Sequence, residues 1–79
     1  MTLETLYEVI ARVKPPEKPL TAETRFVDDL GLDSLTVMEL VAEVEDTFDI
    51  NVPINLLPEI HTVGELAATI DRLRSEQHE

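Results

Sequence analysis

The sequence contains no cysteine, no tryptophan and only three other aromatic residues. The lack of cysteine excludes a disulfide framework and any thiol chemistry of the chain's own. No apolar run approaches the length of a membrane span, and no secretory signal pattern is visible. We therefore expect a cytoplasmic protein without membrane insertion. Its 79 residues predict a single domain, residues 1–79, with an aliphatic core.

Basic residues are also scarce, and their distribution is uneven. The formal net charge is −11, and the segment from Phe26 to Asp71 holds eleven acids but no lysine or arginine. Such a charge disfavours nucleic acid and anionic membranes as partners. The acidic segment is either a solvated surface or a docking face for basic patches on partner enzymes, and the two interpretations are compatible.

The spacing of apolar residues predicts an all-α fold, a small bundle of three long helices and one short helix. Long helices are expected over residues 3–13 and 34–47, the second capped by Asp33, and a short one over 54–60, broken near Pro58. A T-x-x-E capping box at Thr62 and Glu65 opens the last long helix, and residues 75–79 are expected to fray. A long loop over 15–33 should be pinned to the core by four apolar side chains: Leu20, Phe26, Leu30 and Leu32.

The stretch Asp29-Leu-Gly-Leu-Asp-Ser-Leu35 lies at the start of the second predicted helix. It places the Ser34 hydroxyl on the first helical turn with no histidine or lysine nearby in sequence to activate it. His61 and His78 stand at no spacing that would form a Ser-His-Asp triad, so a hydrolase is disfavoured. The acids lack the spacing of a calcium loop, and we predict no metal site. Ser34 is thus better suited to carry an attached group than to catalyse.

This stretch, together with Phe48-Asp49-Ile50-x-Val52-Pro53 and Thr62-Val63-Gly64-Glu65-Leu66, resembles the acyl carrier protein family over residues 26–70. The resemblance implies that a phosphopantetheinyl transferase attaches phosphopantetheine from coenzyme A to Ser34, flanked by Asp33 and Leu35. The arm would hold acyl groups as thioesters and deliver them to acyl-transferring and acyl-modifying enzymes of fatty-acid or lipid synthesis. Asp33 could approach the magnesium ion that the transferase binds. The protein itself would be a monomeric carrier and not an enzyme.

The helix that follows Ser34 is the predicted docking element. Leu35 and Met38 fall off its buried stripe and would form an apolar contact point, although Met38 could equally be a peripheral core residue. Glu39, Glu43 and Asp46 would supply the charged contacts.

Two departures from the family pattern predict a specialised carrier. Thr36 stands where many fatty-acid carriers have an acid, and the apolar run over 54–57 replaces a segment that is often acidic there. Leu56 or Leu57 would then contact a partner, unless both fill the core. Two alternatives stay open: a carrier for an amino acid or a polyketide, and an unmodified acidic interaction module.

Overall fold

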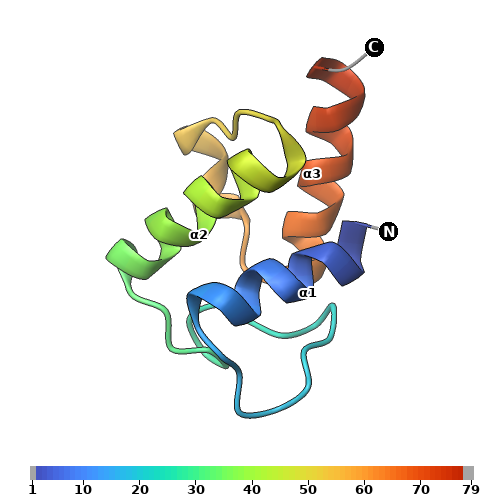
Figure 1. The fold of residues 1–79 in the computed structure, drawn as a ribbon. Helices are drawn as coiled ribbons and strands as arrows, with labels where there is room; N and C mark the ends of the chain where they lie inside the picture. Colours follow the sequence, from blue (N-terminus) through green and yellow to red (C-terminus); the bar gives the residue numbers. More distant parts are fainter. Residues whose placement is uncertain (1, 78–79) are drawn as a thin grey trace.

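A computed structural model describes residues 2–77 of the chain. It contains the helices α1 (Thr2–Val13), α2 (Ser34–Phe48) and α3 (Val63–Gln77), with the 3₁₀ helix η1 (Ile54–Glu59) between the last two. Helix α1 packs against both α2 and α3, so it lies across the two other long helices (Figure 1). The predicted all-α architecture of three long helices, one short helix and a long first loop is confirmed.

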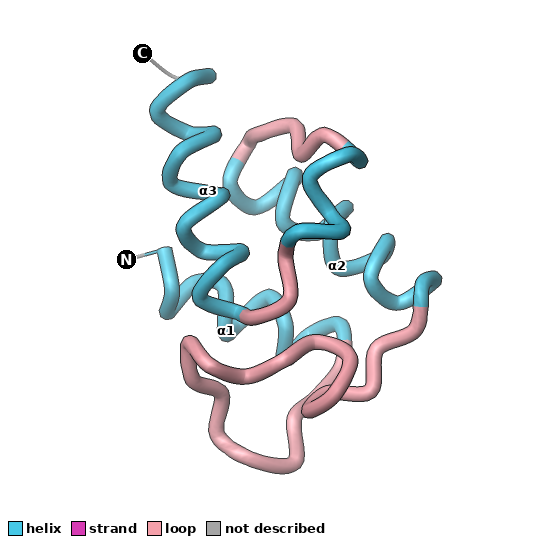
Figure 2. The backbone as a smooth tube through the Cα atoms, turned by 180° about the vertical axis from the view of Figure 1, so that it is seen from behind, coloured by secondary structure: helices cyan, strands magenta, loops and turns pink. Residues whose placement is uncertain are grey.

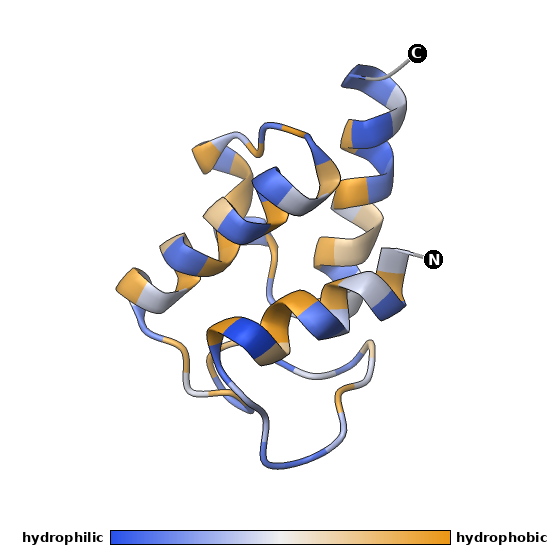
Figure 3. Cartoon of the chain, in the orientation of Figure 1, coloured by the Kyte–Doolittle hydropathy of each residue, from blue (hydrophilic) through white to orange (hydrophobic). Residues whose placement is uncertain are grey.

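The core is aliphatic and lies where the three long helices meet. Figure 3 shows apolar faces of the helices turned toward one another. Helix α3 buries one apolar stripe at helical spacing: Val63, Leu66, Ala67, Ile70 and Leu73. Val9 of α1 is also completely buried, which the sequence did not indicate. Helix α1 buries Leu6, Val9 and Ile10 because it faces two helices at once.

The predicted break at Pro58 is wrong, because η1 continues through it to Glu59. The reason lies in the hydrogen bonds of the two 3₁₀ turns. Leu56 N donates to Pro53 O over 3.0 Å, and Ile60 N donates to Leu57 O over 3.1 Å. Pro58 is the second residue of the latter turn, where its fixed φ is favourable and no N–H is required.

The predicted fraying from Ser75 onward is wrong for residues 75–77, and residues 78–79 lie outside the described part of the chain. Helix α3 extends to Gln77. The Gln77 side chain accepts a 2.9 Å hydrogen bond from Asn51 N and donates one of 3.0 Å to Asn51 O. This amide pair ties the end of α3 to the turn between α2 and η1, a contact between residues far apart in sequence.

The long loop between α1 and α2 is anchored as predicted. Phe26 and Leu32 are buried, and Leu20 and Leu30 pack against the core. The loop also pairs with the chain before α3, which the sequence did not indicate. Phe26 N donates to His61 O and Val63 N to Thr24 O, and these two bonds form an antiparallel bridge between Arg25 and Thr62. Gly64 N also donates to Ala22 O. Figure 2 shows this loop closing one end of the bundle.

Gly64 allows the closest of these approaches. A β-carbon on Gly64 would lie 3.0 Å from Ala22 O and 3.1 Å from the Ala22 β-carbon. In an ordinary helix position alanine stabilises relative to glycine. Here Gly64→Ala should instead lower the free energy of unfolding by about 1–2 kcal/mol, because the loop must shift to make room.

Urea unfolding of Gly64→Ala tests this expectation. Adding Ala22→Gly to the variant removes one of the two close atoms and should restore part of the lost stability. A Gly64→Ala variant at least as stable as the unchanged protein would contradict the close packing of loop and helix.

Candidate attachment site at the start of α2

Ser34 is the first residue of α2, and its side chain is exposed. The preceding Asp33 is the N-cap, as predicted, with extended backbone angles. Its Oδ1 accepts a 2.8 Å hydrogen bond from Thr36 N, and its carbonyl accepts one of 2.9 Å from Val37 N. The cap therefore fixes where α2 begins, and it leaves the Ser34 hydroxyl outside the capping bonds.

The turn before Asp33 sets the direction in which the chain enters α2. Gly31 has a φ of +65°, in the left-handed region that other residues adopt at a cost. Its N–H donates to Val27 O over 3.0 Å, and Leu32 N donates to Phe26 O over the same distance. Asp29 Oδ2 accepts from Arg25 N over 2.7 Å. The turn is thus held from both of its ends, so the serine is presented on a fixed support.

The amide hydrogens at the start of α2 are not all used within the chain. Thr36 N and Val37 N bond to Asp33, whereas Ser34 N and Leu35 N have no hydrogen-bond partner within residues 2–77. Free amides at this end of a helix favour an anion nearby. No hydrogen bond joins the Ser34 side chain to a histidine, lysine or carboxylate in the same part of the chain. The hydroxyl is therefore accessible to an external enzyme and lacks a base of its own.

The predicted docking residues lie along one exposed side of α2. Leu35 is 70% exposed and Met38 is 47% exposed, so Met38 belongs to the surface rather than to the core. Glu39 and Asp46 are exposed, and Glu43 is half-buried. The arrangement is an apolar spot beside acidic side chains, which is the usual composition of a protein docking site.

Glu45, on the same helix, has a structural role. Its carboxylate Oε2 accepts a 2.8 Å hydrogen bond from Val52 N, and its carbonyl accepts from Ile50 N. Glu45 was not among the charged contacts predicted for this helix. The bond to Val52 could not be read from helical periodicity, because it depends on how the following turn folds back.

One exposed apolar residue, Val27, was missed by sequence reasoning, whereas Ile54 opens the apolar run that the sequence singled out. Val27 is 65% exposed and Ile54 is 71% exposed. Leu56 and Leu57 are partly buried and pack against the core. Neither is fully buried, so the expectation that one of these leucines contacts a partner stays a prediction. In helix η1, the side chains of Leu56 and Leu57 pack against the core, whereas that of the first residue, Ile54, is exposed.

Within the part of the chain that the structure describes, no cluster of three or more histidine, cysteine or acidic residues could hold a metal ion. No helix in the same part is long and apolar enough to cross a membrane.

Comparison with known proteins identifies the family. The family model described as phosphopantetheine attachment site matches residues 4–70. The chain belongs to the acyl carrier protein family. It is 35% identical over 77 residues to the meromycolate extension acyl carrier protein of Mycolicibacterium aurum, covering 98% of this chain and 77% of the relative. It is also 35% identical to an acyl carrier protein of Rhodococcus erythropolis, covering 94% of this chain and 79% of that protein.

A solved structure agrees with this assignment. The solution structure of a holo acyl carrier protein from Geobacter metallireducens is similar, with a TM-score of 0.82 and 30% sequence identity. The match covers 99% of this chain and 93% of the other. As a member of the family, the protein is a carrier with a covalently bound phosphopantetheine group and is not an enzyme. Such carriers work with acyl-handling enzymes of lipid synthesis.

Two carboxylates cap the helices of this acyl carrier protein. Hydrogen bonds from Thr36 lower the pKa of Asp33 below its ordinary value of 3.8. Hydrogen bonds from the His61 and Thr62 backbones lower the pKa of Glu65 below 4.5, since its Oε1 accepts from both N–H groups over 2.9 Å. Glu65 N in turn donates to Thr62 Oγ1 over 3.1 Å, which completes the predicted capping box.

The cap at Asp33 should make stability depend on pH. The pKa of Asp33 is lower in the folded chain than in the unfolded chain. The stability that the charged carboxylate contributes is therefore fully present above pH 3.8. That contribution is lost as the pH falls through the lower folded value. We expect Asp33→Ala to lower the Tm most at neutral pH and progressively less in acid.

Thermal unfolding between neutral pH and pH 3 measures this dependence. Asp33→Asn keeps a side-chain acceptor that does not titrate, so the Tm gap between the Asn and Ala variants should stay constant. If Asp33→Ala lowers the Tm by the same amount at every pH, the charge on Asp33 does not contribute to stability.

Proposed function

We propose that Ser34 carries the phosphopantetheine arm of this acyl carrier protein. The observation that supports this most strongly is the position of an exposed hydroxyl at the first residue of α2 within the sequence Leu-Gly-Leu-Asp-Ser-Leu. A fixed turn on one side and a capped helix on the other hold the hydroxyl in place. An enzyme can therefore reach it without any part of the carrier having to unfold.

The residues around Ser34 fit such a group. The free N–H groups of Ser34 and Leu35 favour an anion on the first turn of α2. The Asp33 carboxylate opposes an anion, but its hydrogen bond to Thr36 N gives it a structural reason to be there. When bound, the arm supplies the thiol that this cysteine-free chain lacks. The protein residues supply attachment, orientation and recognition, and tethering raises the local concentration of the acyl group at a docked enzyme.

The partners of this site are a phosphopantetheinyl transferase and enzymes that transfer or modify the acyl group. We propose that they dock on α2, with Leu35 and Met38 as apolar contacts and Glu39, Glu43 and Asp46 facing basic patches. The carrier works as a monomer in the cytoplasm, which sedimentation of the holo-protein and cell fractionation would test.

The attachment itself is tested by incubating the protein with a phosphopantetheinyl transferase and coenzyme A. Intact-mass spectrometry should show the addition of one phosphopantetheine, and peptide mapping should assign it to the peptide that holds Ser34. A chain that several such transferases leave unmodified would instead support the unmodified interaction module.

We further propose that the carrier is specialised within lipid synthesis. Several relatives are named meromycolate extension acyl carrier proteins, which is the name of a dedicated rather than a general carrier. Two surface residues support the same view, since Ile54 is 71% exposed in η1 and Thr36 stands two residues after Ser34 where many fatty-acid carriers have an acid. Charged residues at the rim of a docking interface set the encounter rate and the specificity. Enzymes whose basic residues pair with acids at these two positions should therefore bind this carrier weakly.

Acyl transfer to enzymes of a general fatty-acid synthase tests the specialisation. The acyl-loaded carrier should be a poorer substrate than a housekeeping carrier, and acids at Thr36 and Ile54 should improve it. Equal turnover of the two carriers would contradict the proposal. Efficient loading by amino-acid-activating or polyketide enzymes would favour those cargoes instead.

A further inference from the structure

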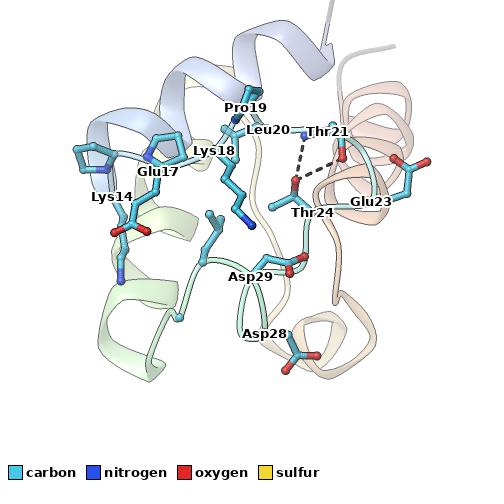
Figure 4. A pocket seen from close by; sticks show the side chains of 14 residues that line it. Lys14, Glu17, Lys18, Pro19, Leu20, Thr21, Glu23, Thr24, Asp28 and Asp29 are labelled. Atoms are coloured by element: carbon cyan, nitrogen blue, oxygen red, sulfur yellow. Dashed lines mark hydrogen bonds between the residues drawn. The ribbon is translucent and has the colours of Figure 1, made fainter.

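Lys14 brings a positive charge to the turn that precedes Ser34. Its Nζ lies 3.8 Å from the place that a β-carbon on Gly31 would occupy. The two residues line one open cavity of about 640 Å³, formed between the end of α1 and the loop before α2 (Figure 4). The interval from Phe26 to Asp71 contains no basic residue, so the positive charge beside Gly31 comes from another part of the chain.

The way α1 ends explains this position. Lys14 N donates to Ile10 O over 2.8 Å, so the helical hydrogen bonds continue one residue past Val13. Pro15 then stops the helix, because a residue before proline resists helical geometry. A lysine at a helix C-terminus is electrostatically favourable, which gives Lys14 a structural reason to be there as well. The test must therefore separate this role from one at the attachment site.

Within residues 2–77, the one salt bridge joins Arg25 and Asp28. The Lys14 ammonium therefore has no ion-pair partner in that part of the chain. It is close enough to Asp33 to contribute to the lowered pKa of that carboxyl, although the hydrogen bonds from Thr36 contribute more. Asp33 Oδ1 already accepts from Thr36 N, so this carboxylate is held by the helix cap. The Lys14 cation thus lies beside Gly31, in the turn before Ser34, without an ion-pair partner in the described residues.

We propose that Lys14 is a positioning residue that pairs with the phosphodiester of the arm on Ser34. This inference rests on the proposed attachment at Ser34. The phosphodiester adds an anion next to Asp33, in a segment that has eleven acids and no lysine or arginine. Lys14 offsets that repulsion and holds the first atoms of the arm toward the end of α1. The rest of the arm remains free to enter partner enzymes.

Lys18 provides a matched control. It lines the same cavity and carries the same charge, but Figure 4 shows its side chain pointing toward Asp29 instead of along the path of Lys14. A general effect of charge on this acidic protein should be the same for both lysines. An effect through the arm should appear for Lys14 alone.

The experiment compares the apo and holo forms of three proteins: the unchanged chain, Lys14→Gln and Lys18→Gln. Urea unfolding gives the folding equilibrium constant of each form. We expect Lys14→Gln to lower this constant about two- to fivefold more in the holo form than in the apo form, as for an exposed ion pair. This additional loss of stability in holo Lys14→Gln should disappear at high salt. The ³¹P resonance of the holo-protein should shift in Lys14→Gln and stay in place in Lys18→Gln.

Equal losses in the apo and holo forms, with an unmoved ³¹P resonance, would overturn the pairing while leaving the attachment at Ser34 intact. The same holo-specific loss in Lys18→Gln would also overturn it, since the effect would then be one of overall charge. If the unchanged chain accepts no arm, the proposed attachment fails first and the pairing fails with it.

Discussion

Ser34→Ala is expected to accept no phosphopantetheine at all from a transferase that fully modifies the unchanged protein. The reason is chemical, because alanine offers no hydroxyl for the phosphodiester bond. The variant should still fold, since the N-cap of α2 is Asp33 and its bonds to Thr36 and Val37 do not involve the Ser34 side chain. The helical circular dichroism spectrum should therefore be unchanged while the mass addition is lost.

The chain contains a second serine, which gives a matched control. Ser75 is exposed and lies near the end of α3. Ser75→Ala should be modified as efficiently as the unchanged protein. Modification that persists in Ser34→Ala, at Ser75 or at one of the threonines, would refute the assignment of Ser34. A loss in both variants would point to damage elsewhere rather than to the attachment site.

Local signals in the sequence predicted the parts of this fold that depend on neighbouring residues. The cap at Asp33 and the capping box of Thr62 and Glu65 are formed within four residues of chain, and both are present. The apolar stripe of α3 follows from helical periodicity in the same way. The start of α2, and hence the place of Ser34, could therefore be predicted to the residue.

Contacts between distant segments could not be predicted in this way. The hydrogen bonds of Gln77 to Asn51 extend α3 beyond its expected end, and the Glu45 carboxylate reaches Val52. Neither contact has a periodic signature. The approach of Lys14 to Gly31 likewise depends on the path of the whole first loop. The sequence thus indicated the proposed attachment residue, whereas the positions of the charges around it could be known only from the fold.

Glu39→Lys is expected to slow modification by the transferase about tenfold at low salt, mainly through a lower association rate. Glu39 is exposed on α2 beside Leu35 and Met38, so a basic patch that approaches Ser34 would meet its carboxylate. Reversing the charge replaces attraction by repulsion within the same contact. Because the interaction is exposed to solvent, raising the ionic strength should narrow the difference between the two proteins.

Glu8→Lys is the matched control, since Glu8 is an exposed acid in the middle of α1 and does not belong to the proposed docking helix. Both substitutions change the net charge by the same amount, so a long-range effect of total charge would slow both variants equally. Glu65 would be a poor control because its carboxylate caps α3, and reversing it would also change stability. The decisive comparison is the modification rate of the two variants at several salt concentrations. If Glu8→Lys is slowed and Glu39→Lys is not, the transferase approaches across α1, and the docking surface proposed on α2 is wrong.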